Sequence, residues 1–522
     1  MFILSKNKII ETNFFYLFVL CIFSFFINFY YSKLGSFPID TFLHYDSAYR
    51  ILKGELPIKD YWVVSGLTVD FVQSFFFKIL GVNWFAYSVH ACILNSIITI
   101  IIFYFFLSLK IKRFIAFILS LSFATLSYTI SGTPFVDLHA TFLLLIATII
   151  IIQNLNRNFI LTWSTVTILF FLSFFSKQVP VAYAVVGYFF ILSFYFIKNK
   201  NYKSIYTVIS TTFIIFAFLV LLSKLTGISY KSFYIQYIDY PRSIGYSRLF
   251  EISFNDFFNK FKFIIISVFL LTFCKFKKIK SKNLEFISDE FFGYLIFLIF
   301  TITLLFHQIM SKNQIYIYFL IPILFGFIES EINQSKIYYK KYLSLLLILT
   351  IIFITAKYHL RYNENRKFHE LTKIQLNQTQ EAKQIHKSLN GLKWKNPSFS
   401  GSSSKEILTL NKALRILDTN FKEEIMVYTH YLFLDSVTEK NLNYPSKTFT
   451  NDGASVPLLG NKYHDYYKKY LIKKIKEKKV NTILFLKHEK ISQNIISNYI
   501  KENCYSINED EIFYILKIKC LN

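Results

Sequence analysis

Cysteine is scarce in this chain, with five among 522 residues, so a fold held together by a disulfide framework is excluded. Three of the five fall in apolar segments that we predict to span a membrane, where cysteine behaves as a small apolar residue: Cys21, Cys92 and Cys274. Cys504 and Cys520 lie in the polar tail, where a bridge could form. A turn near 508–510 would place Cys504 opposite Phe513 in a hairpin. We therefore predict that Cys504 and Cys520 do not form a disulfide.

Two ligand-binding motifs are also absent. No spacing of His and Cys resembles a zinc site. No glycine-rich phosphate loop opens a predicted helix of the tail, so nucleotide binding there is unsupported. His90 and His139 lie just inside predicted spans, and we interpret them as polar residues satisfied within the helical bundle.

Acidic residues are few beside basic ones, 32 against 58, which gives a formal net charge of +26. Basic loops that orient membrane spans and attract anionic lipids account for this excess. We therefore expect membrane lipids as partners and no nucleic acid.

Hydrophobic residues make up 54% of the chain and aromatic residues 20%, and they fall in blocks. Crossing a bilayer core takes about 20 consecutive apolar residues. The blocks predict a mostly α polytopic membrane bundle of about eleven helices, at 13–31, 84–109, 114–131, 138–152, 159–175, 181–197, 205–223, 261–274, 291–308, 314–328 and 342–356. No small-residue cleavage site follows the first run, so we expect an uncleaved anchor.

The orientation follows from basic residues in the short loops. Fifteen of them fall on one side of the predicted spans, and only Lys177 and Lys312 fall in short connections on the other. Because basic loops stay in the cytoplasm, the N-terminus is expected inside. The stretch 38–81, the loop 224–260 and everything after Lys357 are expected outside, in a periplasm or its equivalent.

The outer stretch 38–81 carries four aspartates and a histidine between very apolar segments: Asp40, His44, Asp46, Asp60 and Asp70. Tyr45, Ala48, Tyr49 and Leu52 recur at helical spacing before Gly54. Val72, Phe75, Phe76 and Ile79 repeat that pattern up to Gly81. We predict two amphipathic helices on a membrane surface, with an acid-bearing loop before and between them.

The tail has a different composition. A Gln- and Lys-rich run, 363–391, is interpreted as an exposed helix, and 396–404 as a linker. Strands are predicted in 423–430, 480–488 and 511–519, separated by helices near 464–479 and 492–503. We therefore predict a transmembrane domain over 1–356, with its first outer loop at 32–83, and a small extracytoplasmic α/β domain over 357–522. The lysine run 468–479 is interpreted as a solvated helix face.

An outer cavity with carboxylates on one wall and basic residues on the others suits sugar transfer from a lipid phosphate. A carboxylate takes the proton of the attacking hydroxyl, and basic residues neutralise the leaving phosphate. The outer basic and aromatic residues that could meet such a headgroup are Lys177, Arg242, Arg248, Lys312 and Tyr316. By these physical arguments alone, the chain is an outer-face enzyme or transporter with an acidic first loop.

The residues also carry a resemblance. Asp40 and Ala48, then ILKGELP, Lys59, Asp60 and Tyr61, resemble the first outer loop of polytopic GT-C glycosyltransferases. The lysine in FSKQ and the Tyr and Pro of YIYFLIP are similar to the bacterial membrane branch of that class. The resemblance covers roughly 13–356. It implies a polyprenyl-phosphate sugar donor, a lipid, glycan or protein acceptor, and multi-pass residence in the cytoplasmic (inner) membrane.

The resemblance also implies roles for individual residues. Asp40 stands where the class places its catalytic acid, but Thr41 follows it where many members have a second acid. His44 and Asp46 complete a DxxxHxD pattern, so the base is open between Asp40 and Asp46. Asp40 could instead cap the following helix. Substrate-binding roles are implied for the remaining positions: Asp60, Tyr61, Lys177, Arg242, Arg248, Lys312 and Tyr316.

Three points stay open in the sequence. Asp60 fits a loop-shaping role as well as a catalytic one. A divalent metal serves some members of the class and not others, so no cofactor is assigned. The rival functions are a glycan ligase or polymerase, favoured by Arg242 and Arg248, and a transporter or flippase for a lipid-linked sugar. The chain shows almost no mid-span charge and no internal repeat, which disfavours transport.

Overall fold

The computed structural model describes residues 8–157, 159–246, 253–281, 285, 288–311, 317–335, 338–371, 374–421, 423–489 and 491–521. Contacts divide the chain into two compact units. Unit 1 comprises Met1–Ser32, Val89–Leu221 and Arg248–Phe368, and unit 2 comprises Lys33–Ser88, Leu222–Ser247 and His369–Asn522. From the sequence, we placed the first outer loop in the transmembrane domain 1–356. In the structure, residues 33–88 instead belong to unit 2, together with the C-terminal segment.

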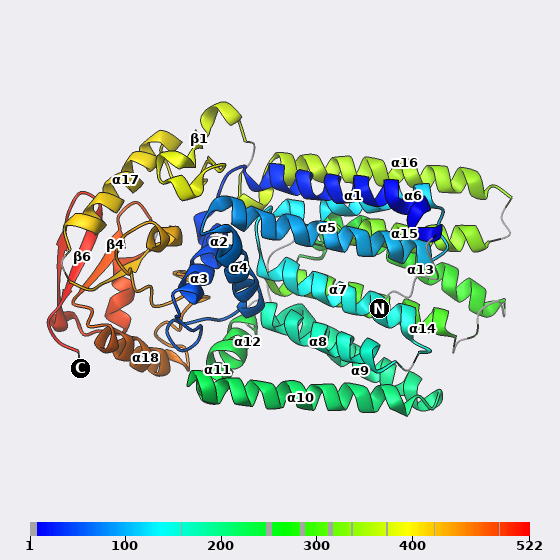
Figure 1. Cartoon of the computed structure of the whole chain (residues 1–522), viewed down its shortest axis with the longest axis horizontal. Coiled ribbons are helices and arrows are strands. Elements are labelled where there is room, and N and C mark those ends of the chain that lie inside the picture. The colour runs from blue at the N-terminus through cyan, green and yellow to red at the C-terminus, as the bar shows by residue number, and fades with distance from the viewer. Residues whose placement is uncertain are drawn as a thin grey trace. The chain divides into compact units, whose positions relative to one another are not determined.

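Unit 1 is built from long apolar helices that run beside one another (Figure 1). They are α1 (Lys8–Ser32), α5 (Trp84–Ser108), α6 (Arg113–Leu126), α7 (Val136–Asn154), α8 (Ile160–Ser176), α9 (Gln178–Lys198), α10 (Tyr202–Thr226), α13 (Phe254–Lys280), α14 (Asp289–Ser311), α15 (Leu320–Gln334) and α16 (Lys340–Tyr358). The ends of α5 and α10 belong to unit 2.

Among the described residues, nine helices are long and apolar enough to cross a membrane. Each of the eleven predicted segments overlaps a helix, although α15 begins six residues after the start of the segment 314–328 that predicted it. Helix α8 has 17 residues and α15 has 15, so the count of eleven stays a prediction. Large apolar side chains face outward, as Phe213 on α10 does with 74% of its surface exposed. Such surface is stable only against lipid, and the chain is therefore a multi-pass membrane protein.

Unit 2 contains the two predicted outer-loop helices. They are α3 (Leu43–Leu52) and α4 (Leu67–Leu80), preceded by the short α2 (Pro38–Thr41). Gly66 precedes α4 with φ +94° and Gly81 ends it with φ +82°, a conformation that glycine adopts without steric cost. The loop after α10 adds α11 (Tyr230–Phe233) and α12 (Tyr240–Tyr246).

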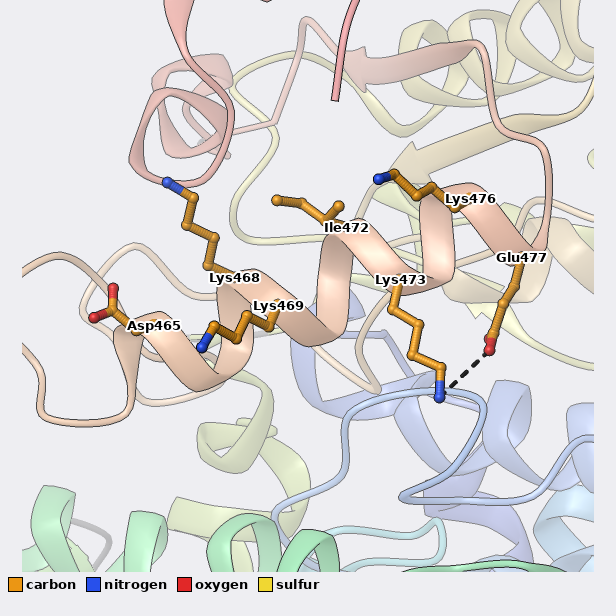
Figure 2. A pocket seen from close by; sticks show the side chains of 7 residues that line it. All are labelled: Asp465, Lys468, Lys469, Ile472, Lys473, Lys476 and Glu477. Carbon is orange, nitrogen blue, oxygen red and sulfur yellow. Dashed lines mark ion pairs between the residues drawn. The ribbon is translucent and has the colours of Figure 1, made fainter. Parts of the chain in front are cut away.

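The tail folds around a four-stranded sheet in the order β3-β4-β6-β5. Its elements are β1 (Gln380–Glu381), β2 (Lys393–Trp394), α17 (Ser403–Thr419), β3 (Ile425–Tyr428), α18 (His464–Glu477), β4 (Thr482–Leu486), β5 (Tyr505–Glu509) and β6 (Phe513–Ile518). Strands β3 and β4 are parallel, and the other pairs are antiparallel. Strands β3, β4 and β6 and helix α18 lie where they were predicted, and α18 turns a lysine-rich face outward (Figure 2).

Three expectations for the tail were wrong. The run 363–391 is not one helix in its described residues: it starts in the last residues of a π-helical turn (His359–Glu364) and continues as 3-10 turns with one short strand. The segment 492–503 forms 3-10 turns, and β5 follows it as a strand that was not predicted. Helix α17 begins inside the predicted linker, where the Ser402 side chain accepts a hydrogen bond from the Lys405 N–H and caps it.

Cys504 and Cys520 do form a disulfide, which corrects the prediction from sequence. Asp510 Oδ1 accepts the N–H groups of Ile512 and Phe513, so the hairpin turns later than 508–510. This shift pairs Tyr505 with Ile518 across β5 and β6. Cys504 therefore meets the end of β6, where its Cα lies 4.7 Å from that of Cys520.

The first outer loop shares one hydrophobic core with the tail. Trp62 is fully buried, with its ring centroid 5.1 Å from that of Tyr467, and Phe42 lies 4.8 Å from Phe433. The backbone N–H of Trp62 donates to the Pro445 carbonyl at 3.0 Å. Burying aromatic side chains contributes about 2 to 3 kcal/mol each, so the outer loop is held rigidly by the tail.

Candidate functional site

Asp40 lies in α2, the first turn of helix after the outer loop begins. Pro38 starts this helix, because its fixed φ suits a first helical position. Residue Asp40 is partly exposed. Phe42 is the residue that directly precedes α3, and its own side chain does not cap that helix. The capping alternative for Asp40 stays a prediction.

His44 and Asp70 are buried together with a lysine from the tail. His44 Nδ1 lies 2.6 Å from Asp70 Oδ1, and Lys447 Nζ donates to Asp70 Oδ2 at 2.6 Å and to the Ser65 carbonyl at 3.0 Å. Burial raises the pKa of Asp70 to about 7 against the attraction of Lys447, and burial lowers the pKa of Lys447. The three side chains hold the outer loop to the tail within unit 2.

Asp46 lies against Arg50 on the same helix. Arg50 Nη1 is 3.9 Å from Asp46 Oδ2, its Nε donates to Glu55 at 2.6 Å, and its guanidinium lies 3.8 Å from the centre of the Tyr61 ring. The Asp46 and Tyr61 side chains have no exposed surface. Burial raises the pKa of Asp46 well above its ordinary value, although Arg50 opposes the shift.

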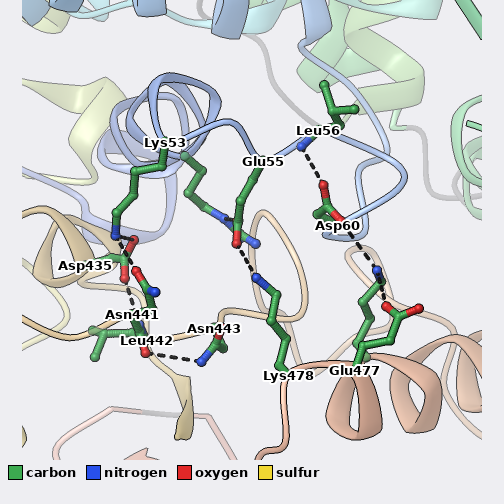
Figure 3. A network of polar contacts seen from close by, with 12 residues as sticks. Lys53, Glu55, Leu56, Asp60, Asp435, Asn441, Leu442, Asn443, Glu477 and Lys478 are labelled. Atoms are coloured by element: carbon green, nitrogen blue, oxygen red, sulfur yellow. Dashed lines mark hydrogen bonds and ion pairs between the residues drawn. The ribbon is translucent and has the colours of Figure 1, made fainter. Parts of the chain in front are cut away.

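Glu55 and Asp60 connect the outer loop to α18 (Figure 3). Glu55 accepts from Lys478 at 2.9 Å. Burial alone would raise the pKa of Glu55, but Arg50 and Lys478 lower it to about 2. Asp60 Oδ2 accepts the Leu56 N–H at 2.8 Å, and its Oδ1 lies 3.5 Å from Lys474 Nζ. These contacts agree with a loop-shaping role for Asp60.

Lys177 belongs to a buried polar cluster of unit 1. It follows α8 in an extended conformation, and its Nζ donates to both carboxylate oxygens of Asp137 at 2.7 Å. His307 Nε2 lies 2.6 Å from Asp137 Oδ1. The Lys177 side chain keeps 26% of its surface exposed, whereas Asp137 and His307 keep 4% and 3%. Asp137 therefore orients a partly accessible cation at the end of a span.

Asp137 and His307 were not assigned from the sequence. Asp137 lies in the predicted outer turn SGTPFVD. A lone acid at the start of an apolar helix could have marked it as a candidate functional residue. Nothing in the sequence pattern marks His307 as a site residue, because its partner Asp137 lies 170 residues away. His90 and His139 meet through their Nε2 atoms at 2.9 Å, as expected of polar residues satisfied in the bundle.

The remaining predicted site residues are spread widely. Arg242 is exposed on α12. Arg248, Lys312 and Tyr316 lie outside the described residues. Within the described ranges no group of three or more His, Cys, Asp and Glu side chains could hold a metal ion. The site roles assigned from sequence all stay predictions.

No protein-family model matches the chain, and no curated protein sequence matches it.

Proposed function

We propose that this protein is an integral membrane glycosyltransferase. It transfers a hexose or pentose from a polyprenyl-phosphate donor to a lipid, glycan or protein acceptor at the outer face of the cytoplasmic membrane. One observation carries the proposal. In an acidic outer loop packed into the core of unit 2, residue Asp40 remains partly exposed, while the side chains of His44 and Asp46 have no exposed surface. The resemblance of this loop to GT-C glycosyltransferases supports it.

The chemistry needs few groups. The acceptor hydroxyl attacks the anomeric carbon of the donor, and Asp40 takes the hydroxyl proton. The bond from the anomeric carbon to the phosphate oxygen breaks, and the lipid phosphate leaves with the electron pair. A basic residue neutralises the developing charge. The sequence predicts this role for Lys177, a cation that Asp137 orients within unit 1.

Asp40 is the base rather than Asp46 in this proposal. A general base must come within hydrogen-bond reach of the hydroxyl. Asp46 is fully buried beside Arg50, and burial favours its protonated form. Asp46 and His44 then act through the shape of the loop rather than on the substrate.

The proposal requires unit 2 to lie outside the cytoplasm. The loop-charge asymmetry supports this placement. The Cys504–Cys520 disulfide supports it independently, because disulfides persist in oxidising compartments. A reporter active only in the cytoplasm, fused after Asn522, is expected to stay silent. Strong reporter activity would place the tail inside and remove the basis of the proposed site.

Mass spectrometry of lipid-linked sugars and surface glycans, with and without the gene, tests the function. Loss of one glycan together with accumulation of one polyprenyl-phosphate sugar is expected. The purified protein should then transfer that sugar. Asp40→Asn should lower the rate by about 10²- to 10⁴-fold, and Asp46→Asn should act mildly. An active Asp40→Asn protein beside an inactive Asp46→Asn protein would transfer the role to Asp46.

A further inference from the structure

Helix α18 presents a basic pocket on the surface of unit 2. The pocket has a volume of about 780 Å³ and is lined by seven residues of this one helix: Asp465, Lys468, Lys469, Ile472, Lys473, Lys476 and Glu477. Figure 2 shows these side chains leaving successive turns of the helix. None of them has a place in the proposed transfer reaction.

The lysines form two rows along the helix. Lys468 and Lys476 flank Ile472 at intervals of four residues, and Lys469 and Lys473 form the second row. Residues four apart on a helix lie on one face, separated by about 6 Å along the axis. The opposite face carries Tyr467, Leu471 and Ile475, whose exposed surface is 0%. The core thus fixes the rotation of α18 and turns the lysines outward.

Most of this positive charge is not neutralised within the protein. Glu477 lies 3.5 Å from Lys473 and 2.7 Å from Lys474, a lysine on the buried side. In the described part of the chain, Lys468, Lys469 and Lys476 form no ion pair. Three amines arranged around one shallow pocket therefore favour an anionic occupant.

We propose that this α18 pocket binds an acidic glycan, a sugar chain bearing carboxylates or phosphates. Its lysines meet the charged groups, while the exposed Asp465 carboxylate accepts hydrogen bonds from neutral hydroxyls. The binding does not depend on the chain being a glycosyltransferase, and it concerns a surface separate from Asp40.

Two other anionic partners, a bilayer surface and nucleic acid, fit this helix face less well. A helix that binds a bilayer surface buries an apolar face in it, but α18 uses its apolar face for the core and leaves only Ile472 among the lysines. Nucleic acid carries a negative phosphate at every nucleotide of its backbone, and this closely spaced charge would meet Asp465 and Glu477 unfavourably. A glycan alternates charged groups with hydroxyls, which matches the mixed lining.

The test measures binding to the full-length protein in nanodiscs of zwitterionic lipid. The probes are an oligogalacturonide and an uncharged dextran oligomer of the same length. The oligogalacturonide is expected to bind, more weakly as salt rises, and the dextran is not. Lys469→Gln with Lys476→Gln should weaken binding about 10-fold, because two exposed charge contacts are lost. Neither lysine forms an ion pair in the described residues, so folding should be unaffected.

The matched control replaces two exposed lysines of unit 2 outside the pocket, Lys383→Gln with Lys387→Gln. This control should bind like the unchanged protein. Equal losses in both variants would mean that net charge alone attracts the probe, and the site would be rejected. Vesicles of phosphatidylglycerol form the third arm. If they bind through Lys469 and Lys476 while the oligogalacturonide does not bind, the surface serves membrane docking and the proposal is wrong.

Discussion

Lys447 of the tail donates a hydrogen bond of 2.6 Å to Asp70 of α4, across 377 residues of sequence. Both side chains are almost completely buried. A buried ion pair contributes little net stability over an apolar pair, but removing one partner leaves an uncompensated charge. This pair therefore makes the position of the acidic loop depend on the tail.

Asp70→Asn should destabilise unit 2 by about 3 to 5 kcal/mol, because the buried Lys447 charge loses its partner. Adding Lys447→Met should restore part of this loss. Thermal unfolding of the full-length protein in nanodiscs measures both effects. Lys412→Met, which removes an exposed pair with Glu511, is the control and should change little. Equal effects at the buried and exposed pairs would contradict the role given to Asp70.

Lys177→Ala should raise KM for the polyprenyl-phosphate donor, because the cation that the sequence predicts to contact its phosphate is lost. Lys224→Ala removes an exposed lysine at the end of α10 and should leave KM unchanged. Both KM values come from the transfer rates of the purified proteins at increasing concentrations of the donor identified by mass spectrometry. Small and equal shifts would mean that Lys177 only extends toward the membrane interface and pairs with Asp137.

Glu489 should make the stability of the tail depend on pH. Burial raises its pKa to about 8, although Thr429 and the His430 N–H favour the charged form. Because the folded pKa exceeds the unfolded value of 4.5, this contribution is fully present below pH 4.5 and is lost as the pH rises through about 8.

Glu489→Gln keeps the shape of the side chain without its titration. The unfolding temperature of the variant should therefore fall less between about pH 5 and about pH 9 than that of the unchanged protein. Glu502→Gln, at an exposed position, should follow the unchanged protein. Parallel curves for all three proteins would show that Glu489 does not titrate in this range.

The Cys504–Cys520 disulfide closes a short loop at the end of the sheet. Replacing both cysteines by serine should lower the stability of unit 2 by about 3 kcal/mol, because the unfolded chain gains freedom. Thermal unfolding measures the loss. Alkylation of the denatured protein with and without reductant counts the thiols directly. Two additional thiols are expected only after reduction, and their presence beforehand would contradict the disulfide.

The sequence alone determined the features that depend on short-range pattern. Apolar runs identified the membrane helices, because length and hydropathy decide whether a segment can cross a bilayer. Helical spacing placed α3 and α4, and apolar runs of β-branched and aromatic residues placed β3, β4 and β6. The register of the last hairpin was missed by a few residues, because Asp510 rather than Asn508 begins the turn. Because of that shift, Cys504 and Cys520 form a disulfide that we had predicted to be absent.

Only the tertiary structure decided how the acids of the outer loop differ. In the sequence, Asp40, Asp46 and Asp70 are equivalent carboxylates beside apolar helices. Asp46 meets Arg50 of its own helix, whereas the lysine that neutralises Asp70, Lys447, lies 377 residues away in the sequence. Asp137 and His307 likewise meet across 170 residues. Periodicity reports neighbours within a few residues, whereas the pKa and accessibility of a carboxylate depend on every segment that packs around it.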